Sequence, residues 1–104
     1  MEINQYESMT EALHDLNKRG FTDSFTVEEG GIRSMTTGKL VRPENVTIVE
    51  YHRFEGDTNP DDMSVVYALE CGDGMRGIIV DAYGTYADPK IAEFLKEVKL
   101  KDGL

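Results

Sequence analysis

The chain is poor in cysteine and in basic residues, the residue types typical of disulfide-bonded secreted proteins and of nucleic-acid-binding proteins. It contains one cysteine and no tryptophan, and its 11 lysines and arginines are outnumbered by 20 acids, for a net charge of −9. Cys71 alone cannot form an intramolecular disulfide, which favours a reducing compartment. Without a basic stripe to displace counterions from phosphates, we expect no nucleic-acid partner and no binding to anionic membranes.

Long hydrophobic runs are also missing. The N-terminal residues have neither a basic segment nor the apolar stretch of a secretory signal. No run approaches the roughly 20 apolar residues that a membrane-spanning helix needs. We therefore expect a cytoplasmic protein.

What the chain does have is material for one antiparallel sheet. Its 104 residues, 39% of them hydrophobic, fit a single domain over residues 1–104 with one core. Three runs rich in β-branched and aromatic residues, 46–55, 63–71 and 75–83, alternate with loops rich in Gly, Asp and Asn, which is typical of a meander. Asp73-Gly74 predicts a two-residue hairpin turn with positive φ at the glycine.

Helices are predicted at both ends of the chain. Residues 8–20 have apolar residues at helical spacing, and a second helix begins at Asp88, an N-cap followed by proline. Between the first helix and the meander, residues 24–28 alternate as a strand does, and residues 32–35 are compatible with a return strand. Gly30-Gly31 fits either a tight hairpin or a loose loop, so whether residues 24–35 form one strand or two stays open.

The predicted fold is α+β. Strands that are adjacent in sequence and joined by short loops pair antiparallel, and amphipathic helices cover sheet faces. We therefore expect a helix, an antiparallel meander of four or five strands and a helix, with both helices packed on one face of the sheet.

The loop 56–62 is the first candidate site. Acids or amides stand at alternate positions, Asp57, Asn59 and Asp61, as at the opening of an EF-hand loop. Such a loop needs Gly at its sixth position and Glu at its twelfth, where this chain has Asp62 and Ala68. The pattern is more economically explained as a turn, and we expect no metal and no other cofactor.

The second candidate is the end of the run that leads to Asp81. An apolar strand, an acid and then Gly84 and Thr85 are superficially similar to a loop that binds phosphoribosyl pyrophosphate. Such a loop carries two adjacent acids and opens a helix whose amides hold the phosphates, whereas here the next helix opens with Asp88, which repels phosphate. We therefore do not expect phosphoribosylpyrophosphate synthetase activity.

No side chain has the context of a catalytic nucleophile, so we predict no catalytic residues. His52 and Arg53 are neighbours on one strand and point to opposite faces. An ion pair across strands, between Arg53 and Asp81 or a glutamate, is the favoured interpretation of that arginine.

Three strings carry a resemblance to a known family: EALHDLNKRGFTDSF, YHRFEGDTNPDDMSVVYAL and IIVDAYGTYAD. Together they resemble a family of small bacterial proteins of about 100 residues, whose members often bear the name phosphoribosylpyrophosphate synthetase. The resemblance extends over nearly the whole chain. It implies a single domain and no catalytic residues.

Two functional hypotheses follow. The first is a non-catalytic interaction module that uses the sheet face left uncovered by the helices, as a homodimer or with another protein. Its predicted interface consists of Val49, Tyr51, Val66, Ala68, Ile79 and Tyr83. The alternative is a small-ligand or metal-binding protein, enzymes included, that uses the acidic loops 56–62 and 81–88. Its predicted ligand-binding residues are Arg53, Asp57, Asn59, Asp61, Asp62 and Asp81. A flat apolar face would favour the first hypothesis, and a concave pocket with polar groups the second.

Overall fold

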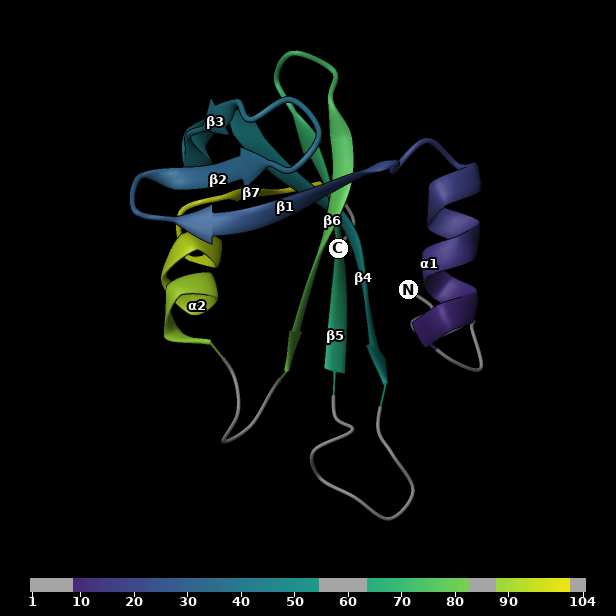
Figure 1. Ribbon diagram of the computed structural model, residues 1–104. Coiled ribbons are helices and arrows are strands. Elements are labelled where there is room, and N and C mark those ends of the chain that lie inside the picture. Colours follow the sequence, from purple (N-terminus) through teal and green to yellow (C-terminus); the bar gives the residue numbers. More distant parts are fainter. Residues whose placement is uncertain (1–8, 55–63, 83–87, 102–104) are drawn as a thin grey trace.

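A curled seven-stranded sheet stands between two short helices in the computed structural model (Figure 1), which describes residues 9–54, 64–82 and 88–101. In chain order the elements are α1 (Met9–Lys18), β1 (Asp23–Glu28), β2 (Gly31–Ser34), β3 (Leu40–Val41), the 3-10 turn η1 (Pro43–Asn45), β4 (Val46–Phe54), β5 (Ser64–Cys71), β6 (Arg76–Ala82), α2 (Pro89–Leu95) and β7 (Lys99–Leu100). The strands lie in the order β3-β2-β1-β6-β5-β4-β7. Neither of the two helices described is long and apolar enough to cross a membrane.

The predicted fold is wrong in its strand count and in its pairing. β4, β5 and β6 do form the expected antiparallel meander. However, β1 pairs parallel with β6, and the two-residue β7 pairs parallel with β4. Pairings between strands distant in sequence leave no local signal, and a two-residue strand is too short to show alternation.

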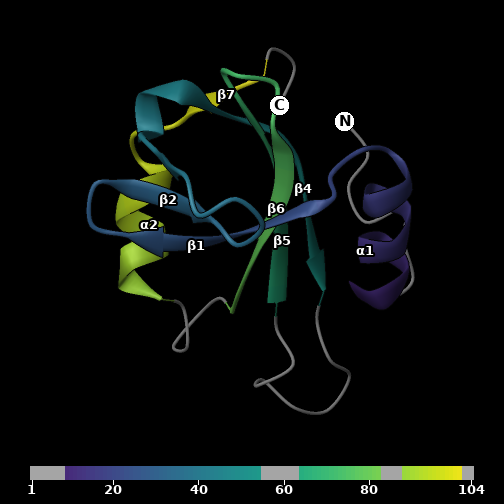
Figure 2. The same cartoon turned by 45° about the horizontal axis from the view of Figure 1, so that its top comes forward.

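The prediction that both helices pack on one sheet face is also wrong, because they lie on opposite faces of the β4–β5–β6 sheet (Figure 2). On the α1 side, Val66 and Ala68 of β5 pack with Leu16. On the α2 side, Leu69 of the same strand packs with Phe94. Each face of the meander therefore has a hydrophobic cover of its own.

A β-bulge in β4 explains part of this error. Ile48 pairs with Leu69, but the next pair is Glu50 with Ala68, so that Val49 is an extra residue in the strand. An extra residue reverses the alternation beyond it. Tyr51 therefore shares the α2 face with Ile48, although three positions separate them.

The junction between β1 and β6 depends on a glycine. β1 meets β6 only through the Cα pairs Asp23–Gly77 and Ser24–Ile78, and its remaining residues pair with β2. A Cβ atom at Gly77 would lie 2.5 Å from the carbonyl oxygen of Asp23 and 2.8 Å from Cε2 of Phe25. Only glycine permits this close crossing.

Several local predictions are confirmed. The question left open for residues 24–35 is answered by a hairpin, with β1 and β2 antiparallel on either side of Glu29-Gly30. Asp88 caps α2 by accepting a hydrogen bond of 2.9 Å from the Lys90 N–H. Gly74 has the expected positive φ, of 91°. The hairpin turn is one residue longer than predicted, because Cys71 donates its N–H to the carbonyl of Met75 across three loop residues.

Candidate functional site

A groove opens on the α2 side of the sheet, with a volume of about 370 Å³. We call it the tyrosine groove. Its lining consists of Ile48, Tyr51 and Arg53 from β4, Val65 and Tyr67 from β5, Leu95 from α2 and Leu100 from β7. The walls are aliphatic and aromatic, and Arg53 is the charged residue among them. Concave sites of this composition, with few polar groups, are where proteins bind small molecules.

The sheet register builds the floor of the tyrosine groove. Tyr51 and Tyr67 are directly paired across β4 and β5, and their ring centroids are 6.3 Å apart with planes tilted by 43°. Two positions further along the same strands, Arg53 pairs with Val65, nearer the end of β4. Successive side chains of one strand alternate between faces, so Tyr51 and Arg53 point to the same side.

α2 and β7 supply the wall opposite the floor. Leu95 is the last residue of α2 and is partly buried against the core on this side. Leu100 follows in β7 and is 60% exposed, so the groove stays open to solvent along this wall. A ligand that covered Leu100 would bury apolar surface that is now in contact with water.

Burial and neighbouring charges shift the pKa of the Tyr67 hydroxyl. Burial raises the pKa of Tyr67, the carboxylate of Asp81 raises it further, and the guanidinium of Arg53 acts in the opposite direction. Because the pKa of Tyr67 lies above its ordinary value of 10.0, the phenol is neutral at physiological pH. It can therefore donate a hydrogen bond to a negatively charged group.

Two of the predicted ligand-binding residues share one row of the sheet. Val65 pairs with Arg53 on one side and with Asp81 on the other, so both charged residues lie on the groove face with Val65 between them. Asp81 accepts a hydrogen bond of 3.1 Å from the N–H of Asp88 and so joins the end of β6 to the start of α2. The other predicted ligand-binding residues, Asp57, Asn59, Asp61 and Asp62, lie outside the described residues.

The predicted interface does not form one exposed surface. Val66 and Ala68 are fully buried on the α1 side, and Val49 packs against the same cluster. Ile79 is buried in the core on the α2 side, whereas Tyr51 lines the tyrosine groove. Tyr83 lies outside the described residues. The sheet face that was expected to be free is covered, because each helix covers a different face.

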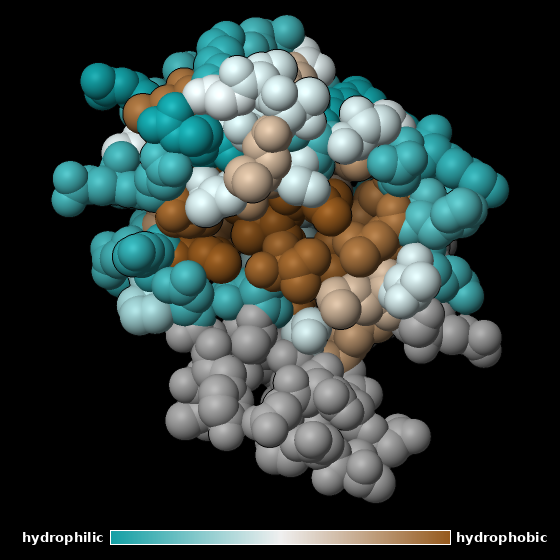
Figure 3. Space-filling model, viewed as in Figure 1, coloured by the Kyte–Doolittle hydropathy of each residue, from teal (hydrophilic) through white to brown (hydrophobic). Residues whose placement is uncertain are grey.

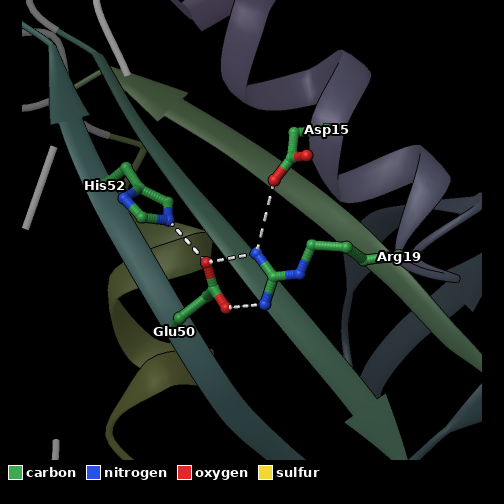
Figure 4. A network of polar contacts seen from close by, with 4 residues as sticks. All are labelled: Asp15, Arg19, Glu50 and His52. Atoms are coloured by element: carbon green, nitrogen blue, oxygen red, sulfur yellow. Dashed lines mark hydrogen bonds and ion pairs between the residues drawn. The ribbon is translucent and has the colours of Figure 1, made fainter. Parts of the chain in front are cut away.

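A polar network joins α1 to β4 on the opposite side of the sheet (Figure 4). Arg19 forms a two-pronged ion pair with Glu50, and Nε2 of His52 lies 2.7 Å from a carboxylate oxygen of that glutamate. Asp15 lies 3.7 Å from the same guanidinium. The hydrogen bond from Arg19 lowers the pKa of Glu50, burial opposes this effect, and His52 reinforces it.

This network anchors the helix. His52 is 1% exposed and Glu50 is 13% exposed, so there is little room for a ligand beside them. Sequence reasoning placed His52 and Arg53 on opposite faces, and the structure confirms it. It missed the ion pair of Glu50 with Arg19, because no local pattern links residues so far apart in the chain.

A larger cleft of about 480 Å³ lies between the β1–β2 turn and α2. Its charged lining residues are Glu28, Glu29, Arg42, Glu44, Lys90, Glu93 and Glu97. It lacks paired aromatic rings, and one of its glutamates, Glu28, is already paired with Arg33. The tyrosine groove, with apolar walls and a single cation, is the better defined ligand site.

Sequence reasoning selected Arg53 as a ligand-binding residue and Tyr51 as an interface residue, and did not place them in one site. Leu95 and Leu100 were missed as site residues. The first of them lies in the predicted final helix, whereas no local pattern predicts that β7 returns beside β4. Knowledge of the bulge at Val49 would have placed Tyr51 and Arg53 on the α2 face.

Among the described residues, no three His, Cys, Asp or Glu side chains are grouped so as to hold a metal ion. Searches of family models, curated proteins and solved structures found no match to the chain. The family resemblance of the sequence therefore stays a prediction, and the function is argued from the geometry of the site.

Proposed function

We propose that the protein binds a small molecule with a flat apolar body and a negatively charged group, and that it does so in the tyrosine groove. The observation that carries this proposal is the pairing of Tyr51 with Tyr67 beside Arg53 on a concave face. By the criterion of a concave pocket with polar groups, the geometry favours the ligand-binding hypothesis.

The apolar part of the ligand would lie over the two tyrosine rings and against Leu95 and Leu100. Aromatic rings favour offset or edge contacts with a flat ligand, which add to the gain from burying apolar surface. A volume of about 370 Å³ is near the lower end of the range of about 300–1,000 Å³ that is typical of ligand pockets. It therefore favours a ligand of one or two rings.

The charged part of the ligand would lie at the Arg53 end of the groove. A guanidinium holds a carboxylate with two parallel hydrogen bonds, and the neutral hydroxyl of Tyr67 supplies a further donor. Asp81 lies on the far side of Val65 and would repel an anion that moved toward β6. These charges fix the orientation of the ligand as well as its class.

The test compares 2-naphthoate with 2-naphthamide, which have the same rings and differ in charge. We expect the carboxylate to raise the melting temperature and to shift the amide resonances of residues 51, 53, 65 and 67, and the neutral amide to bind about tenfold more weakly. Arg53→Gln should remove the preference for the carboxylate. Arg42→Gln, which changes an exposed arginine outside the groove, is the matched control and should retain it.

The proposal fails if neither compound shifts resonances in the tyrosine groove. It fails equally if Arg53→Gln and the wild type prefer the carboxylate to the same extent. Tyr67→Phe separates the two donors, because it removes the phenol and leaves the ring in place. We expect this variant to weaken the carboxylate more than the amide.

A further inference from the structure

The outer edge of β6 is open over its second half. β1 pairs with this edge only at Gly77 and Ile78 and then turns away toward β2. Within the described parts of the chain, no strand pairs with the outer edge of residues 79–82. The backbone N–H and C=O groups of an unpaired edge are a template for another strand.

The surface around this edge is apolar. Figure 3 shows a hydrophobic band across the middle of the molecule, where Figure 1 places β6 between α2 and α1. Val80 is 42% exposed, although it pairs with the fully buried Val66. Its neighbour Ile79 belongs to the core on the other face. Val80 therefore leaves apolar surface exposed at the middle of this strand, beside the buried Ile79.

The charges near the edge are acidic. Asp81 stands on β6 itself, Asp88 is joined to it by a hydrogen bond, and the whole chain carries a net charge of −9. A second copy of the chain would bring another −9 and a second pair of these carboxylates to the same place. Like charges at such short range disfavour self-pairing, whereas basic residues would be attracted.

We propose that the outer edge of β6 accepts an extended segment of another protein by β-strand addition, and that this segment carries apolar residues at alternate positions with lysine or arginine at its ends. Backbone hydrogen bonds to residues 79–82 would supply the pairing. An apolar side chain beside Val80 would cover the exposed surface of that valine, and one basic end would lie near Asp81 and Asp88, which stand together at one end of β6. This site is separate from the tyrosine groove and does not depend on it.

The probe is the peptide Lys-Val-Thr-Val-Thr-Val-Lys. We expect it to shift the amide resonances of residues 79–82 and to slow their hydrogen exchange, with an affinity that falls as salt is added. The same peptide with proline at its central position keeps the charge but loses a backbone donor. We expect it to bind at least about tenfold more weakly.

Two protein variants make the test specific. Val80→Lys places a positive charge at the edge and should weaken the peptide by about tenfold or more. Leu40→Lys is the matched control, since Leu40 is also 42% exposed and lies on β3 at the far edge of the sheet. Both positions are on the surface, so both variants should fold, which circular dichroism would verify.

The proposal is overturned if the peptide does not bind, if Val80→Lys binds it as the wild type does, or if the shifts lie elsewhere. Sedimentation velocity tests the competing occupant. A wild-type dimer that Val80→Lys dissociates would mean that a second copy takes the edge, which would overturn the assignment to a basic segment. A monomeric wild type that binds the peptide supports it.

Discussion

Replacing Gly77 by alanine tests the crossing of β1 over β6, the feature on which the curled sheet depends. The new Cβ would lie 2.5 Å from the carbonyl oxygen of Asp23 and 2.8 Å from its carbonyl carbon. These are backbone atoms, which cannot move aside as a flexible side chain can, so the two strands must separate. Overpacking of this kind typically costs about 1–3 kcal/mol, and we expect a value near the upper end.

Two other glycines isolate the cause of that loss. Each Gly→Ala change lowers the conformational entropy of the unfolded chain, and this contribution by itself stabilises the protein by roughly 0.4–1 kcal/mol. At Gly72 the new Cβ would make only an ordinary contact, 3.8 Å from the carbonyl oxygen of Asn45, so this variant should be neutral or slightly stabilised. At Gly74 the space is open but φ is +91°, a conformation that costs an alanine about 1–2 kcal/mol. A net loss of about 1 kcal/mol is expected there.

The assay is urea denaturation followed by far-UV circular dichroism, because the chain has no tryptophan to report on its core. The expected order of stability is Gly72→Ala, then wild type, Gly74→Ala and Gly77→Ala. Equal m-values would show that the unfolded states are comparable. If Gly77→Ala is as stable as Gly72→Ala, the two strands do not cross at this residue and the reasoning is refuted.

Two further predictions follow from buried titratable groups. Burial acts to raise the pKa of Asp23, but hydrogen bonds from Ser34, Thr36 and Ser24 outweigh it and lower this pKa below its ordinary value of 3.8. Ionised Asp23 therefore stabilises the fold fully above about pH 4, and this stabilisation is lost as the pH falls through the folded-state pKa. Asp23→Asn should lower the free energy of unfolding at pH 7 and make it decline less steeply in acid. Urea titrations between pH 2 and pH 7 would measure both effects. Burial, with smaller contributions from acidic neighbours, raises the pKa of Cys71 to about 11, so at pH 8 iodoacetamide should alkylate the folded protein about a hundredfold more slowly than the urea-unfolded chain, and equal rates would contradict this.

The elements that the sequence alone identified are those with a local cause. Gly74 provides the positive φ of a hairpin, and Asp88 followed by proline caps a helix, as each would in almost any fold. Val66 and Ala68 were correctly assigned to one and the same face of β5. These features depend on residues within a few positions of one another, so they can be recognised without knowledge of the fold.

The site required information that no local pattern holds. Tyr51 reaches the α2 face only because Val49 is an extra residue opposite β5, and a bulge is defined by a pairing rather than by a sequence. Arg53 was selected from the sequence for its charge, but its place beside Tyr67 depends on the same register. Leu100 completes the groove only because β7 returns to lie parallel with β4.

The sequence by itself determined that the chain forms a central meander, where it turns and where its helices begin. The tertiary structure decided which face each helix covers, where the sheet curls and where the groove and the open edge lie. The sequence does not show which face is covered by which helix, because both faces of the meander are apolar enough to be buried. The crossing at Gly77 and the bulge at Val49 are contacts and pairings between strands, so no local pattern of the sequence contains them.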